Sequence, residues 1–168
     1  MDTAAFYGTT SAVSFTLLGF WWVVVQFRHG EMTQDAGRRR LAFVISLHFI
    51  LPGLMSLGAL LTADAPIVWR LTFGLAGVTG MAAVLVASRG VKEPTGAIAA
   101  IGRAEWLALP LYAVLTIVAV RPDLAQSTVG LIPLQVEGIV MTLLVGFGIL
   151  FAWALFTEPH PESGGDAS

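Results

Sequence analysis

Long apolar runs, separated by short polar segments, dominate the chain and predict helices that cross a membrane. A helix needs about 20 mostly apolar residues to cross the hydrocarbon core of a bilayer. Five runs approach or exceed this length, at about residues 3–27, 41–61, 67–88, 104–120 and 131–156. The fourth run is short, so it either begins earlier, within 95–101, or forms a re-entrant segment. The pattern predicts an all-α polytopic membrane domain over residues 1–156, with about five transmembrane helices in a small bundle.

Composition supports this assignment. Hydrophobic residues make up 56% of the chain and charged residues only 12%, with a mean hydropathy of +0.80. Soluble domains hold about twice that share of charge. A net charge of −2 excludes the basic surface of a nucleic-acid-binding protein. Cysteine is absent, which excludes disulfides and thiolate metal sites. The predicted partner is therefore the lipid bilayer, with no cofactor.

Basic residues predict the orientation of the chain. Seven of the nine lie in the two longer connections between runs, and only Arg70 and Arg121 fall toward the other side. Lysine and arginine concentrate in cytoplasmic loops. This predicts an N-terminus outside and a cytoplasmic C-terminal tail, residues 157–168, which is expected to be disordered. The N-terminus lacks the positive region of a signal peptide, so the first run is expected to be retained. The excess of arginine over lysine favours a bacterial inner membrane.

Glu137 is the main candidate functional residue. It lies about six residues inside the last run, and a carboxylate there is costly unless it is paired, protonated or facing water. One hypothesis is that Glu137 forms an ion pair with Arg70, which lies at a similar depth. The others are that Glu137 lines a cavity or pore mouth, or that it is exposed at the membrane interface. Arg70 itself either pairs with Glu137 or extends to the outer headgroups.

Two further runs hold polar candidates. Tyr7, Ser11 and Ser14 share one helix face, which predicts either a helix contact or a hydroxyl-lined path for water or ions. His48 precedes Pro52 by four residues, so a freed carbonyl and a titratable ring coincide at a predicted kink. His48 is either a neutral residue bonded to a neighbouring helix or a proton-sensitive gating residue. It is the only histidine within a run, so no metal site is expected.

Small residues at helical spacing predict close helix packing. Gly138, Thr142 and Gly146 form one such face, and Ala76 and Gly80 belong to another. At the start of the fourth run, Glu105 is expected to be solvated or bound to headgroups. Tyr112, deeper in the same run, is expected to need a hydrogen-bond partner.

No nucleotide-binding, metalloprotease or serine-hydrolase motif is present, so the chain is not expected to be an enzyme. The favoured function is a homo-oligomeric ion channel or channel-like conduit, because one small bundle has little room for an aqueous path. A ring of Glu137 carboxylates from several copies would attract cations. The alternative is a non-catalytic accessory or assembly subunit that uses its small-residue faces to pack against another membrane protein. A small transporter and a membrane enzyme or sensor are lesser alternatives.

Overall fold

The computed structural model describes residues 2–30, 35–61, 66–88 and 101–157. Within these ranges, five helical segments are long and apolar enough to cross a membrane. They are α1 (Thr3–Phe27), α3 (Ala36–Leu60), α4 (Pro66–Ser88), a segment of residues 101–120, and α8 (Pro133–Phe156). The fourth segment joins one helical turn, the 3-10 turn η2 (Glu105–Leu107) and α6 (Ala108–Val120). The fold is all-helical, as predicted.

Helix ends differ from the sequence prediction at three places. α3 begins five residues early, at Ala36, because the side chain of Asp35 accepts hydrogen bonds from the N–H groups of Gly37 and Arg38. The fourth segment contains 20 residues, about the length of a full crossing, so it is not a short re-entrant piece by length. A short helix, α7 (Asp123–Val129), was not predicted; it ends at Gly130, whose φ of 69° suits glycine. The predicted disordered tail, apart from Thr157, lies outside the described residues.

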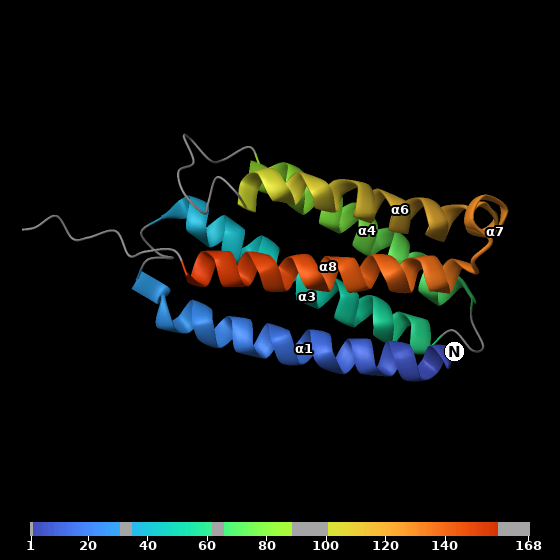
Figure 1. Cartoon of the computed structure of the whole chain (residues 1–168), viewed down its shortest axis with the longest axis horizontal. Coiled ribbons are helices and arrows are strands. Elements are labelled where there is room, and N and C mark those ends of the chain that lie inside the picture. Colours follow the sequence, from blue (N-terminus) through green and yellow to red (C-terminus); the bar gives the residue numbers. More distant parts are fainter. Residues whose placement is uncertain (1, 31–34, 62–65, 89–100, 158–168) are drawn as a thin grey trace, which may run out of the picture.

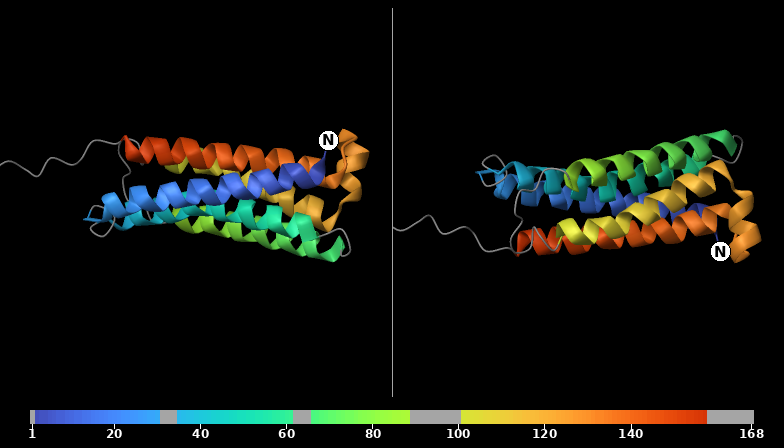
Figure 2. Two further views of the ribbon diagram at one scale, coloured as in Figure 1. Left: turned by 90° about the horizontal axis from the view of Figure 1, so that it is seen from below. Right: turned by 90° about the horizontal axis from the view of Figure 1, so that it is seen from above.

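The five long segments run side by side along the long axis of the molecule (Figure 1). α7 and the N-terminus lie at one end, which we call the α7 end. The opposite end, where α1 finishes and α3 begins, we call the Arg28 end. α3 is the central helix: 78% of its most apolar stretch is buried, against 17–33% for the other four segments. The two additional views show α4 and α8 at opposite edges of the bundle (Figure 2).

Two arginines connect neighbouring helices by hydrogen bonds to the carbonyl groups at helix ends. Arg28, which follows α1, donates to the carbonyls of Leu155 and Phe156 at the end of α8, at 2.6 and 3.0 Å. Arg70 of α4 donates to the carbonyls of Ala119 and Val120 at the end of α6, at 2.8 and 2.9 Å. The last carbonyls of a helix lack intrahelical donors and carry partial negative charge, so a guanidinium stabilises them. These contacts fix the ends of α8 and of the fourth segment, which carry the buried acids described next.

Candidate functional site

Glu137 lies in the second turn of α8, completely buried. Pro133 starts this helix, and the Gln135 side chain accepts a hydrogen bond from the N–H of Ile132 at 3.2 Å. Glu137 is 0% exposed, and neither carboxylate oxygen has a hydrogen-bond partner among the described residues. Burying such a group without a partner is costly. Ionisable residues in membrane-spanning helices usually mark a functional site for that reason.

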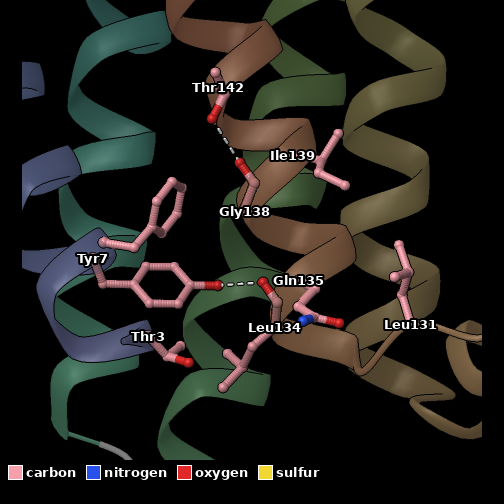
Figure 3. A pocket seen from close by; sticks show the side chains of 9 residues that line it. Thr3, Tyr7, Leu131, Leu134, Gln135, Gly138, Ile139 and Thr142 are labelled. Atoms are coloured by element: carbon pink, nitrogen blue, oxygen red, sulfur yellow. Dashed lines mark hydrogen bonds between the residues drawn. The ribbon is translucent and has the colours of Figure 1, made fainter. Parts of the chain in front are cut away.

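Tyr7 of α1 is buried near Glu137. Its hydroxyl donates a 2.6 Å hydrogen bond to the carbonyl of Leu134, and the phenol is close enough to Glu137 to interact with it electrostatically. Tyr7 also lines a hollow of about 260 Å³ between α1 and the first turns of α8 (Figure 3). Thr3, Gln135 and Thr142 place polar atoms in its otherwise apolar lining. The buried acid and the surface hollow thus have one neighbour in common, the side chain of Tyr7.

The predicted ion pair between Arg70 and Glu137 is not formed. Arg70 is bound to the carbonyls at the end of α6, and the carboxylate of Glu137 has no partner in the described part of the chain. Similar depth in two helices does not bring two side chains together when they face different neighbours. The capping contact also differs from the predicted snorkelling, because the guanidinium satisfies protein carbonyls.

The hydroxyl face of α1 points into its own bundle. Tyr7, Ser11 and Ser14 are 1%, 4% and 0% exposed. They span eight residues of helix, a rise of about 10 Å along its axis. The hydroxyl of Ser14 has no hydrogen-bond partner among the described residues. α1 thus carries buried hydroxyl groups from the level of Glu137 toward the middle of the molecule.

His48 lies at the centre of the bundle, among α3, α6 and α8. Its Nδ1 is 2.9 Å from the carbonyl of Val44 in the same helix, and its Nε2 has no partner among the described residues. The ring is 6.0 Å from that of Tyr112 and 5.6 Å from that of Phe151, measured between centroids. Pro52 is inside α3, which continues as helix to Leu60. The hydrogen bond of His48 is therefore made within its own helix and not to a neighbouring one.

Glu105 and Tyr112 are two further buried polar groups, and the burial of Glu105 was not predicted from the sequence. Glu105 is 1% exposed, so the expectation that it is solvated is wrong. The fourth segment begins at Ile101, which places Glu105 inside it and on the same helix face as Ala108 and Tyr112. Glu105 Oε1 and the Tyr112 hydroxyl both lack a hydrogen-bond partner in the described residues. The helical spacing of residues 101, 105, 108 and 112 was the available signal.

The predicted packing residues have different surroundings. Ala76 and Gly80 are buried, and a Cβ at Gly80 would collide with the ring of Tyr112. Gly138 packs against Phe6, where an added Cβ would be 2.9 Å from the ring. The other two members of the α8 face point outward: Thr142 is exposed, and nothing lies within 4 Å of a Cβ added at Gly146. The close contact on this face is confined to its α7 end.

The exposed charges at the α7 end pair with each other. Arg121 and Asp123 form an ion pair of 3.0 Å, with each side chain 63% exposed. The hydrogen bond from Arg121 lowers the pKa of the Asp123 carboxyl below its ordinary value. This pair is at the surface, outside the membrane-spanning segments, and is distinct from the buried groups.

No group of three or more histidine and acidic side chains able to hold a metal ion occurs in the part of the chain that the structure describes. Comparison with protein families, with curated proteins and with solved structures finds no match for this chain. The five apolar helices define an integral membrane protein of helical type. The fold shows this class of protein, and the buried polar groups are the features that bear on its function.

Proposed function

We propose that this protein is a channel-like conduit for cations whose path passes through the inside of a single helix bundle. The observation that carries the proposal is the complete burial of Glu137 with both carboxylate oxygens unpartnered in the described residues. An apolar interior disfavours an isolated carboxylate, so this group is expected to hold a proton or another cation. A group that takes up and releases a cation inside a membrane is what a conduit needs.

The location of Glu137 favours a path within one copy over a path between copies. A ring of carboxylates around a shared pore would require Glu137 to face outward from its own bundle, whereas it faces inward. Hydroxyl groups of α1 and the imidazole of His48 continue the line of buried polar groups toward the Arg28 end. We place that end in the cytoplasm of a bacterial cell, because most of the basic residues belong to it.

Ion flux into liposomes tests this function. Purified protein is reconstituted, and the flux of H⁺, Na⁺ and K⁺ is measured for the wild type, Glu137→Gln and Asp123→Asn. The two variants make the same chemical change, but Asp123 is exposed on α7. We expect flux of at least one cation in the wild type and in Asp123→Asn, with loss of that flux in Glu137→Gln. Absence of flux for all three cations in the wild type would contradict the proposal.

A non-catalytic accessory subunit is the second candidate. A Cβ added at Gly8, Gly19 or Gly146 would meet nothing within 4 Å, so these positions leave backbone open to another membrane helix. The mass of the complex extracted in mild detergent distinguishes the two functions. A fixed complex with an unlike membrane protein, together with no ion flux, would support the subunit.

A further inference from the structure

We infer that the conducted ion is the proton, and that Glu105, Tyr112 and His48 carry it through the half of the bundle nearer the Arg28 end. This inference rests on the proposed conduit and names its ion. Its basis is a second set of buried polar atoms without partners in the described residues: Glu105 Oε1, the Tyr112 hydroxyl and His48 Nε2. They come from the fourth segment and from α3, on neighbouring faces.

The hydrogen bond of His48 determines which of its nitrogens is available. A carbonyl oxygen only accepts, so Nδ1, 2.9 Å from the carbonyl of Val44, must carry the hydrogen. In the neutral ring, Nε2 is then an acceptor with an unused lone pair, because it has no donor among the described residues. A proton that reaches His48 therefore has one place to bind.

Within the described residues, Tyr112 is an unsatisfied donor whose ring is adjacent to that of His48. Its ring centroid is 6.0 Å from that of His48, and its hydroxyl is completely buried. Gly80 of α4 allows the ring to lie in this position, since a Cβ there would collide with it. The Tyr112 hydroxyl, as donor, can reach Nε2 of His48, as acceptor, through a small side-chain rotation or through one intervening water.

Glu105 lies on the Arg28 side of Tyr112. It precedes Tyr112 by seven residues, or two helical turns, and is close enough to interact with it electrostatically. Aromatic side chains on a helix lean toward its N-terminus, so the Tyr112 hydroxyl extends in the direction of Glu105. The phenol therefore stands between a buried acid and a buried base.

The transfer step balances without any additional reactant. Tyr112 gives its hydroxyl proton to Nε2 of His48 and receives a proton from the carboxyl of Glu105. The O–H bond of Tyr112 is broken and re-formed, Glu105 becomes a carboxylate, and His48 becomes an imidazolium. Glu105 is then reprotonated from the Arg28 end. His48 loses the proton on Nε2 toward the hydroxyls of α1 and Glu137, which restores the neutral ring with its hydrogen on Nδ1.

The surroundings of His48 favour a proton over a metal cation. α8 places Gly148 and Phe151 next to His48, and α6 places Tyr112 there. The described residues contain no set of three acidic or histidine side chains that could replace the water shell of a metal ion. A phenol, an imidazole and separated carboxyls are groups that exchange protons.

Proton flux in liposomes tests the inference with matched variants. Tyr112→Phe removes only the hydroxyl and keeps the ring against Gly80. Thr116→Val, one turn away, removes a hydroxyl that is bound to the carbonyl of Tyr112 in its own helix. We expect Tyr112→Phe to lower proton flux by about tenfold or more, and Thr116→Val to leave it unchanged. Glu105→Gln is the second loss variant, and each protein is compared only after its helical content and melting profile match the wild type.

The outcomes separate this inference from the proposed function. Proton flux that depends on Tyr112 and Glu105 supports both. Flux of Na⁺ or K⁺ without proton flux would overturn the inference and leave the conduit in place. Proton flux that is unchanged in both Tyr112→Phe and Glu105→Gln would also overturn it. Absence of all cation flux in the wild type would remove the conduit itself.

Discussion

The hydroxyl of Tyr7 and the carbonyl of Leu134, 127 residues apart in the chain, are joined by a hydrogen bond of 2.6 Å. This bond connects the start of α1 to the start of α8 and holds the phenol ring near the buried Glu137. Because α1 packs mainly along α3, the contact determines how α1 meets α8 at the α7 end.

Removal of this hydroxyl should cost stability. Tyr7→Phe keeps the ring contact with Phe73, whose centroid is 6.3 Å away, and loses the bond to Leu134. Hydrogen bonds between membrane helices contribute about 0.6 kcal/mol on average, so we expect a loss of about 0.5–1 kcal/mol in unfolding free energy. Unfolding in mixed detergent micelles measures it. Thr10→Val is the control, since that hydroxyl bonds only within α1, and an equal loss there would contradict the assignment.

Gly148 and Gly146 offer a matched pair on one helix. A Cβ added at Gly148 would lie 2.8 Å from the Phe49 ring and 2.9 Å from Cβ of His48, whereas one at Gly146 would meet nothing within 4 Å. We expect Gly148→Ala to destabilise the protein by about 1–3 kcal/mol because the core is overpacked. Gly146→Ala should be neutral or slightly stabilising, since alanine favours helix. Thermal unfolding in detergent measures both, and the reverse order would show that α8 is rotated relative to this structure.

Arg70 and Glu137 should behave as independent residues. The structure separates them, so the effects of Arg70→Gln and Glu137→Gln on unfolding free energy should add to within about 0.5 kcal/mol in the double variant. Arg70→Gln alone should weaken the end of α6, because two carbonyls lose their donor. A coupling energy well above that limit would indicate that the two charges interact after all.

The pKa of Asp123 should respond to its neighbour. The hydrogen bond from Arg121 lowers this pKa, so Arg121→Gln should raise it toward the ordinary value of an aspartate. Any stability that the Arg121–Asp123 pair contributes is present when the pH is above the pKa of Asp123 in the unfolded chain. It is lost as the pH falls through the lower pKa of Asp123 in the folded protein. Carbon-13 NMR titration of the carboxyl measures the shift. Because both side chains are largely exposed, Asp123→Asn is expected to leave folding and flux unchanged, and an unchanged pKa in Arg121→Gln would show that the ion pair is absent.

The crossing segments could be predicted from the sequence because length and hydropathy determine them. The extension of α3 to Ala36 depends on a side-chain cap at Asp35, and α7 depends on a left-handed glycine; both are local details within polar connections. Glu137 and the inward face of Tyr7, Ser11 and Ser14 were identified from position and spacing alone. Their surroundings depend on how the helices rotate and pack.

The role of Arg70 and the burial of Glu105 required the structure for a different reason. Depth along a helix can be read from sequence, but the neighbour that a side chain faces cannot. Arg70 faces the end of α6 and not Glu137. Glu105 was assigned to the surface because its segment was started at residue 104, three residues late. With the start at Ile101, its spacing to Tyr112 would have predicted a shared buried face.

Proton flux from vesicles that contain no more than one copy of the chain tests the central claim most directly. If the path passes through Glu137 inside a single bundle, such vesicles should conduct protons with the wild type and with Asp123→Asn, but not with Glu137→Gln. Equal conduction by Glu137→Gln, or conduction that appears only when several copies share a vesicle, would contradict the account.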